Sequence, residues 1–361
     1  MTADLDGSPA GQGRLTSTRS VSRTLDHRED DRGRGLKAAV RDRYGSVDVV
    51  ELREIDTPVP ADDEVLVRVH AASVNRADLD LILPKPGFTR LFLGLRRPRD
   101  RRIGCDVAGV VEAVGAAVTR FQRGDRVFAD MYPHGLGSFG EMVCARETAF
   151  QHVPTGMSHD DAATLPHAAI LAIQGLRRRD GRTIGPGDRV LIDGASGNVG
   201  PFAVQIAKAR GAEVTGVCST DKLDFVRSLG ADHVIDYRAQ DYTTTGERYD
   251  WILAADAHHS IFRIRHALRP NGVYVTLGGS TPRLFQAMLV GPVMTLATGK
   301  PMGLMLWWKP FRAEDVDALA RLYAAGTLRP AIDRRYPLDK VVDALRYVDE
   351  GHARGKVLIT A

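Results

Sequence analysis

The alternation of apolar and polar positions changes along the chain, and each part predicts a different kind of structure. From residue 36 onward, short apolar stretches are separated by turn residues such as Gly115, Gly124 and Asp125. Many short strands joined by glycine-rich turns are typical of an antiparallel, barrel-like β domain. The strands expected in this part lie at residues 36–41, 65–69, 107–114 and 126–129.

After Pro154, stretches with helical spacing alternate with short apolar stretches, beginning with a helix expected at residues 160–176. Strands are then expected at 189–192, 213–217, 233–235, 251–254 and 273–277, with helices at 199–210, 222–229 and 261–268 between them. This alternation is typical of βαβ units around a parallel sheet, so the fold class is α/β with a doubly wound parallel sheet. Helices at 313–325 and 338–350 and a strand at 356–360 complete the expected elements.

Two segments depart from these patterns in opposite ways. Residues 1–35 hold few apolar side chains and no periodicity, which predicts a disordered extension because little surface can be buried. Residues 284–308 are strongly apolar, but glycines and prolines interrupt them, so we do not expect them to span a membrane. We expect them to be buried at a pocket or at a subunit interface.

Composition and charge restrict the class of protein. The 361 residues are 43% hydrophobic and carry a net charge of +4, as in an ordinary soluble protein with a full core. The three cysteines are far apart and odd in number, and no apolar secretory signal precedes the domains, so we expect a cytoplasmic protein.

One basic stretch bears on the choice of partner. We interpret it as a solvated loop and expect no nucleic-acid partner, although salt-dependent RNA binding would support the rival view. The stretch comprises Arg96, Arg97, Arg99, Arg101 and Arg102.

The most informative segment runs from Val190 to Gly200, where an apolar strand enters a glycine turn and a helix follows at once. That context indicates dinucleotide binding, and an ordinary tight turn in an unrelated α/β protein is the alternative. Gly197 would let the backbone approach a pyrophosphate, Gly200 would let the helix pack close to the strand, and Ala195 replaces the first glycine of the usual pattern. The residues expected to bind the cofactor here are Ala195, Ser196, Gly197, Asn198, Val199 and Gly200.

The end of the next strand predicts which nicotinamide cofactor binds. NAD sites usually carry a carboxylate there, which bonds the ribose hydroxyls. This chain has Cys218 at that position. Ser219 and Thr220 follow and can donate to a 2′-phosphate, and Lys222 can neutralise it, so we expect NADPH. The alternative is that Ser219 and Thr220 only cap the following helix and that Lys222 is solvated.

Five groups of residues together resemble the medium-chain dehydrogenase/reductase superfamily, in particular its zinc-free quinone oxidoreductase-like branch. They lie at 104–115, 121–127, 194–200 with 203–208, 229–236 and 355–359. The resemblance implies a GroES-like β-barrel catalytic domain at 36–157 that is completed by 310–361, and a Rossmann NADP-binding domain at 158–309. It implies an active site in the cleft between these domains, and it places residues 284–308 at the substrate pocket and the contacts of a homodimer.

The resemblance also raises the question of a metal, since zinc alcohol dehydrogenases of this superfamily hold catalytic zinc with a Cys, a His and a Cys. The matching positions here are Asn75, Cys105 and His167, with the adjacent acid at Asp106. Catalytic zinc takes thiolate, imidazole or carboxylate ligands, and Asn75 is a poor one. We therefore expect no metal, and we interpret Cys105 as a small buried residue and His167 as a helix-start or pocket-lining residue. A residual site formed by Cys105 and His167 is the alternative.

For a zinc-free member, the resemblance implies that NADPH passes hydride to a small lipophilic quinone or conjugated carbonyl compound, while the protein supplies orientation and electrostatics. Asn75 is the expected polar group beside the nicotinamide or the substrate. Asp78 is the second catalytic candidate, although closing a turn suits it better. Three more residues are expected at the cofactor, the first two near the nicotinamide amide: Gly278, Gly279 and Lys356.

The proton donor is not identified by the sequence. Tyr132 and His134 lie in a loop that could reach the cleft, although residues of such loops are more often idle. His258 and His259 stand where this branch usually has a glycine-containing turn, and we interpret them as solvated at a helix start. Two other functions stay open, namely an aldehyde-reducing alcohol dehydrogenase with residual metal and a non-catalytic nucleotide-binding sensor.

Overall fold

Between Leu36 and His152 the strands pair antiparallel with one another, as the alternating pattern predicts. The computed structural model describes residues 35–84, 87–178, 180–306, 308–310 and 312–361. The disordered extension expected at residues 1–35 falls outside this part of the chain, apart from Gly35. The residues from Gly35 to Ala361 form one compact unit.

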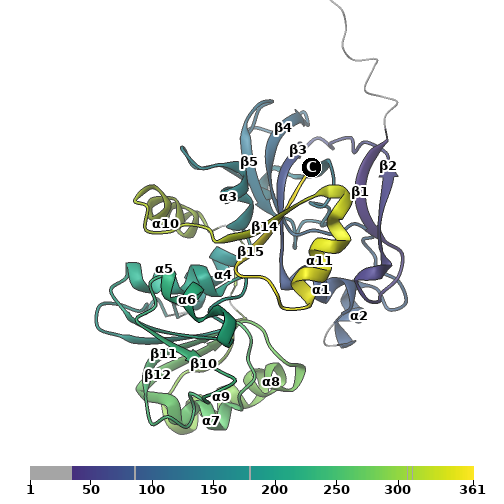
Figure 1. Cartoon of the computed structure of the whole chain (residues 1–361). Helices are drawn as coiled ribbons and strands as arrows, with labels where there is room; N and C mark the ends of the chain where they lie inside the picture. Colours follow the sequence, from purple (N-terminus) through teal and green to yellow (C-terminus); the bar gives the residue numbers. More distant parts are fainter. Residues whose placement is uncertain (1–34, 85–86, 179, 307, 311) are drawn as a thin grey trace, which may run out of the picture. The chain divides into compact units, whose positions relative to one another are not determined.

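A seven-stranded sheet organises the catalytic part, in the order β14-β15-β3-β4-β5-β7 with β6 paired to β3 (Figure 1). A separate hairpin pairs β1 with β2. The strands are β1 (Leu36–Arg41), β2 (Val50–Ile55), β3 (Glu64–Val74), β4 (Asp106–Val114), β5 (Arg126–Asp130), β6 (Met142–Arg146), β7 (Phe150–His152), β14 (Ile332–Pro337) and β15 (Lys356–Thr360).

The last strand of the chain returns to this first sheet. β15 pairs antiparallel with β3, opposing Val357 to Val74, and α11 (Val341–Asp349) packs near β15 and α1 (Arg76–Ile82), as the yellow and purple–blue elements of Figure 1 show. α2 (Arg90–Leu93) follows α1. The return brings the residues around 355 next to those around 75, which sequence order alone does not reveal.

A six-stranded parallel sheet organises the dinucleotide-binding part, in the order β10-β9-β8-β11-β12-β13. The strands are β8 (Arg189–Asp193), β9 (Glu213–Cys218), β10 (His233–Asp236), β11 (Tyr249–Ala254), β12 (Leu268–Thr276) and β13 (Met302–Leu304). The helices are α4 (Ala168–Gly175), α5 (Gly200–Ala209), α6 (Leu223–Ser228), α7 (Ile261–Ala267), α8 (Thr281–Phe285) and α9 (Gly291–Thr298). α10 (Ala313–Ala324) packs against α4.

The central strands of this sheet are buried on both faces. Val190 and Ile192 of β8 contribute to one core with helices α4 and α5, whereas Leu191 contributes to a second core with α7. Alternate side chains of a strand point to opposite faces, so a continuous apolar strand needs a layer of helices on each side. The predicted doubly wound arrangement is confirmed.

The helix expected at residues 160–176 is two helices instead of one. α3 (His159–Thr164) and α4 are separated by Leu165, Pro166 and His167. Proline lacks the N–H that a helix interior requires and clashes with the preceding turn, so the break falls there. The break places His167 at the N-terminus of α4.

The apolar segment at 284–308 is not one element. It contains the end of α8, a π-helical turn (Gln286–Val290), α9 and β13. Leu289, Val293 and Leu296 are 64%, 62% and 89% exposed, so this chain does not bury them. Across the part of the chain that the structure describes, no helix combines the length and the apolar character needed to cross a membrane.

Candidate functional site

The phosphate turn lies at the carboxyl ends of the parallel strands, where ligands of open α/β sheets bind. β8 ends at Asp193, and the turn leads directly into α5. Gly194 has a φ of +83°, a left-handed conformation that glycine adopts without strain. The N–H of Ala195 donates to the Val217 carbonyl at 2.9 Å, which ties the turn to β9.

The glycines of the turn differ in what surrounds them. A methyl group added at Gly200 would lie 2.3 Å from the Gly194 carbonyl oxygen and 2.4 Å from the Ala195 carbonyl carbon. Gly200 is therefore required for the close packing of helix against strand that the sequence predicts. A methyl group added at Gly197 would meet only the Gly194 oxygen, at 3.5 Å, so this position stays open to a ligand. These residues fit a dinucleotide phosphate.

The turn also contacts the returning C-terminal segment. The Gly355 N–H donates to the Ser196 carbonyl at 3.0 Å. With its side-chain amide oriented to satisfy both neighbours, Asn198 donates to the Gly355 carbonyl at 3.1 Å and accepts from the Arg76 N–H at 3.1 Å. Ser196 and Asn198 thus connect the dinucleotide-binding part to α1 and β15.

The residues expected at a 2′-phosphate lie together at the end of β9, where Lys222 is buried. Lys222 is 8% exposed, and its ammonium donates to the Gly351 and Ala353 carbonyls at 2.7 and 2.8 Å. The expectation of a solvated Lys222 is therefore wrong. The Thr220 hydroxyl donates to Asp236 at 2.5 Å. Ser219 occupies the N-cap position of the short helix at Thr220–Lys222 without a side-chain capping bond.

Two basic side chains near this position were not singled out by the sequence. Arg238 lies 3.7 Å from Asp221, and the charge of Arg354 acts on Lys222 and helps burial lower its pKa. Arg238 lies in the loop after β10 and Arg354 in the loop after α11, and neither belongs to a recognisable sequence motif. The structure thus adds Arg238 and Arg354 to the cations near the end of β9.

Gly278 and Gly279 follow β12 at the same sheet edge. The Gly278 carbonyl accepts from the Ala257 N–H at 2.9 Å, and a methyl group at Gly279 would lie 2.5 Å from the Ala257 nitrogen. These glycines hold the segment after β11 close to the sheet. The side chain of His258 is 67% exposed, as expected, whereas that of His259 is 22% exposed and contacts the Tyr242 ring.

A buried polar network connects Asn75, Asp106 and Lys356. The Lys356 ammonium donates to Asn75 Oδ1 at 2.6 Å and lies 3.4 Å from Asp106 Oδ2. Asn75 Nδ2 donates to the same Asp106 oxygen at 2.8 Å, and the Ser73 hydroxyl donates to it at 2.8 Å. All four side chains are at most 1% exposed, so Asn75 and Lys356 face each other inside the protein.

Asp78 closes the first turn of α1, the structural role that the sequence favours. Its Oδ2 accepts the Asn75 backbone N–H at 2.7 Å, and its Oδ1 has no hydrogen-bond partner. Burial raises the pKa of Asp78 to about 6, against the opposing effects of Cys105 and the Asn75 N–H. Burial also lowers the pKa of Lys356, while Asp106 and Asp78 oppose that shift.

His167 is the functional side chain that the sequence did not assign to the chemistry. Its Nδ1 lies 2.9 Å from Asp130 Oδ2, and its backbone N–H donates to Asp106 Oδ1 at 3.0 Å. Asp130 is fully buried, whereas the imidazole is 15% exposed. Burial lowers the pKa of His167, but the charge and hydrogen bond of Asp130 outweigh it, so the net pKa is raised. The signal in the sequence was Pro166, which predicts a helix start here.

Two aromatic rings surround this imidazole. The Tyr132 ring lies 6.0 Å from the His167 ring and the Trp308 ring lies 5.6 Å from it, measured between centroids. The Tyr132 backbone N–H donates to Asp130 Oδ1 at 2.9 Å, so one carboxylate holds both the imidazole and the loop that carries Tyr132. The apolar segment thus reaches the site through its last residue, Trp308.

The residues at the zinc-matching positions do not fit a catalytic zinc ion. The Asn75 amide is used at both ends, and its oxygen already accepts from a lysine ammonium, which would repel a cation. Cys105 is buried beside Asp78 with Leu81 and Leu136. Within the described ranges, no three His, Cys, Asp or Glu side chains are grouped so that they could hold a metal ion.

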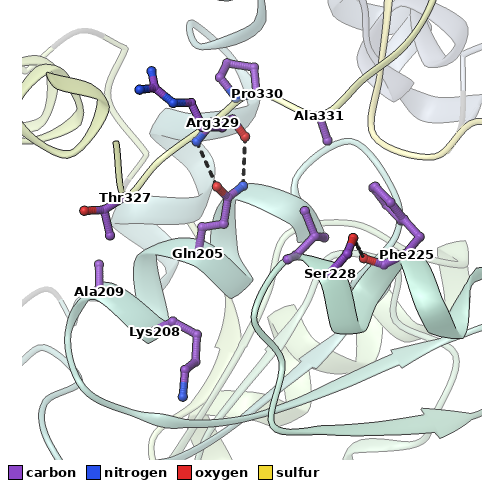
Figure 2. Close-up of a pocket in the computed structure, with 10 residues that line it drawn as sticks. Gln205, Lys208, Ala209, Phe225, Ser228, Thr327, Arg329, Pro330 and Ala331 are labelled. Atoms are coloured by element: carbon purple, nitrogen blue, oxygen red, sulfur yellow. Dashed lines mark hydrogen bonds between the residues drawn. The ribbon is translucent and has the colours of Figure 1, made fainter. Parts of the chain in front are cut away.

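A pocket of about 560 Å³ lies elsewhere, at the opposite end of α5 from the phosphate turn (Figure 2). It includes Lys208, Phe225 and Pro330 but none of the expected site residues. Gln205 pairs with the backbone of Arg329 in two hydrogen bonds of 2.8 and 3.0 Å. This contact anchors the segment that leads back to β14.

Comparison with known proteins identifies the family. The chain matches the family described as alcohol dehydrogenase GroES-like domain over residues 61–155, and that described as zinc-binding dehydrogenase over residues 229–359. It is 34% identical over 357 residues to the mitochondrial NAD(P)H oxidoreductase RTN4IP1 of Mus musculus, covering 90% of this chain and 89% of that protein. It is 31% identical over 338 residues to the chloroplastic quinone-oxidoreductase QR1 of Triphysaria versicolor, covering 91% and 99%.

A solved structure agrees with these relatives. The quinone oxidoreductase from Coxiella burnetii superposes with a TM-score of 0.78 at 28% identity, covering 91% of this chain and 100% of that one. The chain belongs to the medium-chain dehydrogenase/reductase superfamily. Within that superfamily it is an NAD(P)H-dependent oxidoreductase of the quinone oxidoreductase-like branch, as the sequence predicted.

The relatives do not support the expected cytoplasmic location. Those from Mus musculus, Bos taurus and Homo sapiens are described as mitochondrial, and that from Triphysaria versicolor as chloroplastic.

Proposed function

We propose that this protein is an NADPH-dependent reductase that transfers hydride to a quinone or a conjugated carbonyl compound without zinc. The observation that carries the proposal is His167, held by the buried Asp130 beside the rings of Tyr132 and Trp308. Flat conjugated molecules pack well on aromatic rings, and a positioned imidazole can donate a proton where negative charge develops. The quinone-oxidoreductase names of relatives support the same substrate class.

The preference for NADPH rests on charge at the end of β9. Cys218 stands where a ribose-binding carboxylate would favour NADH. Ser219 offers a hydroxyl group there, and the Thr220 hydroxyl, which donates to Asp236, would have to turn to donate to a phosphate. Lys222, Arg238 and Arg354 supply positive charge nearby. Lys222 uses two N–H groups for backbone carbonyls, which leaves one for a phosphate oxygen.

The bound dihydronicotinamide supplies the hydride. His167 supplies the proton: Nε2 donates to the substrate oxygen that becomes negative, and water returns the proton to the imidazole afterwards. Asp130 accepts the hydrogen bond from Nδ1–H, which orients the ring and stabilises its protonated form. Hydride and proton together convert a quinone or a conjugated carbonyl to its reduced, neutral product.

Asn75 then acts at a distance from the substrate. Its amide lies between Lys356 and Asp106, and Asp106 accepts the His167 backbone N–H. The buried network therefore positions the start of α4 and, through it, the imidazole. We propose positioning roles for Asn75, Asp78 and Lys356.

We also propose that the protein is a homodimer. β13 is an edge strand of the parallel sheet, and α9 packs beside it with its apolar side chains facing outward. Apolar side chains beside an unpaired strand edge suit contact with a second copy of the same chain.

The test begins with fluorescence titration of the purified full chain with NADPH and NADH, followed by addition of phenanthrenequinone. We expect tighter binding of NADPH, quinone-dependent oxidation and no effect of a chelator. His167→Gln should lower kcat by roughly 100-fold or more with an unchanged Kd for NADPH. His233→Gln is the matched control, since that histidine also pairs with an acid, Glu213, but is the first residue of β10, at the amino end of that strand.

Each failure has a distinct meaning. Absence of binding by either cofactor would mean that the glycine turn is misinterpreted. Binding without turnover of any quinone or enone would favour a nucleotide-binding sensor. Full activity of His167→Gln would assign the proton to another group, and loss of activity on chelation would favour the metal alternative.

A further inference from the structure

α2 and the basic stretch that follows it carry an exposed apolar surface. Leu91, Phe92 and Leu95 are 63%, 72% and 67% exposed. Three large apolar side chains within five residues are costly to leave in water, so such clusters commonly mark an interaction site.

The segment that carries these side chains is held in place by hydrogen bonds. The Tyr44 hydroxyl donates to the Gly94 carbonyl at 2.8 Å, and the Arg99 N–H donates to the Leu93 carbonyl at 2.9 Å. Gly94 has a φ of +117°, and a methyl group there would lie 2.1 Å from the Arg97 carbonyl oxygen. The loop is therefore tightly closed.

Both ends of the loop are fixed to the catalytic part. Leu93 packs against the buried group of Leu81, Cys105 and Leu136. At the other end, the Arg41 N–H donates to the Arg101 carbonyl at 2.8 Å. Leu93 faces the interior of the protein. The side chains of Leu91, Phe92 and Leu95 therefore face outward.

Charge surrounds this apolar group. Residues 90–102 contain six arginines and one acid, Asp100. Arg96, Arg97 and Arg99 are exposed, while Arg101 lies 3.4 Å from Asp42. A combination of exposed Leu and Phe with flanking arginines is suited to the boundary between lipid headgroups and acyl chains.

We propose that residues 90–99 form a docking loop for the surface of a bilayer that contains anionic lipids. Leu91, Phe92 and Leu95 enter the interfacial region, and the arginines pair with the headgroup phosphates. The apolar side chains distinguish this partner from RNA, whose phosphate backbone would use the arginines and leave leucines in water. This inference stands independently of the proposed reaction.

The experiment is sedimentation of the full chain with vesicles of phosphatidylcholine containing phosphatidylglycerol, and with pure phosphatidylcholine as reference. We expect binding that depends on phosphatidylglycerol and weakens with salt. Each arginine near an anionic surface strengthens binding about five-fold, so Arg96→Gln with Arg97→Gln should weaken it roughly 25-fold. Leu91→Ser, Phe92→Ser and Leu95→Ser together should weaken it at least about ten-fold.

Two matched variants keep the test specific. Arg248→Gln with Arg321→Gln removes two exposed charges elsewhere, and Val59→Ser with Val114→Ser removes exposed apolar side chains outside both the loop and α9. Both should bind vesicles as the unaltered protein does. The serine triple variant should keep its thermal stability and its oligomeric state, because the changed side chains are exposed.

Several results would overturn the proposal. Vesicle binding that the serine triple variant leaves unchanged would overturn it. Loss of vesicle binding in the Val59→Ser and Val114→Ser variant instead would do the same. RNA binding that needs the arginines but not the apolar side chains, without vesicle binding, would assign the loop to nucleic acid. A change of oligomeric state in the triple variant would assign the loop to a subunit interface.

Discussion

The two glycines of the phosphate turn provide a sharp test of how the site is built. Gly200→Ala and Gly197→Ala add the same methyl group three residues apart, but the structure predicts opposite consequences. At Gly200 the methyl carbon would lie 2.3, 2.4 and 2.5 Å from the Gly194 oxygen and the Ala195 carbonyl carbon and oxygen. These are backbone atoms, so relief requires the whole turn to move away from α5.

The effect of that movement on the free energy of unfolding can be estimated from two opposing contributions. Overpacking a well-packed site costs about 1–3 kcal/mol, and alanine returns up to about 1 kcal/mol through its better helix propensity. We therefore expect Gly200→Ala to lower the free energy of unfolding by about 2 kcal/mol, with a decrease in Tm of roughly 3 °C. Cofactor binding should be lost with it, because the displaced turn no longer presents its N–H groups.

Gly197→Ala isolates the contribution of the ligand. Its methyl group would have only an ordinary contact of 3.5 Å with the Gly194 oxygen, so the stability of the protein without cofactor should change by less than about 0.5 kcal/mol. The same methyl group would stand between the backbone and the pyrophosphate. We expect the Kd for NADPH to rise at least ten-fold.

Thermal unfolding without cofactor and fluorescence titration with NADPH measure the two effects separately. Unchanged stability of Gly200→Ala would refute the packing described for α5 against the turn. Unchanged NADPH affinity of Gly197→Ala would refute the approach of the phosphates to this residue. The opposite pattern, with Gly197→Ala unstable and Gly200→Ala tolerated, would invert the assignment of the two glycines.

Two other perturbations follow from the dinucleotide-binding part. Burial raises the pKa of Asp193 to about 7, although the Tyr242 hydroxyl donates to this carboxyl group. The folded protein therefore favours the neutral carboxyl group, and the stability that this group contributes is lost as pH rises from about 4 through 7. In urea unfolding, the free energy of unfolding of Asp193→Asn should match that of the parent near pH 4 and exceed it by up to about 4 kcal/mol at pH 8.5. An equal difference at both pH values would contradict the raised pKa of Asp193. Val293→Ser with Leu296→Ser should convert the proposed dimer to a monomer in light scattering, and an unchanged mass would remove α9 from the interface.

Local patterns predicted much of the fold. The continuous apolar strands at Val190–Ile192 and Trp251–Ala254 require helices on both faces, and the structure has them. The glycine turn between strand and helix is predictable for the same reason, since Gly200 packs against atoms only five or six residues away. The break at Pro166 was missed because the apolar spacing continues across it and outweighed the proline in the prediction.

The chemistry of the site was harder to predict. Asn75 was expected beside the substrate because its position matches a metal ligand of relatives, but its surroundings depend on Asp106 and Lys356, which lie 31 and 281 residues further along the chain. His167 was interpreted as a helix-start or pocket-lining residue without a chemical role, since nothing near it in sequence indicates Asp130 as its partner. The exposure of Leu91 and Phe92 was likewise unpredictable, because an apolar pair in sequence is ordinarily buried.

The sequence by itself determined the features that depend on near neighbours: the βαβ alternation, the glycine turn, the absence of a carboxylate at Cys218 and the family. Only the tertiary structure decided which side chains meet. The return of β15 to β3 brings Lys356 to Asn75, and the start of α4 brings His167 to Asp130. The physical reason is that burial, pKa and hydrogen bonding depend on distances in space, which no local pattern of residues encodes.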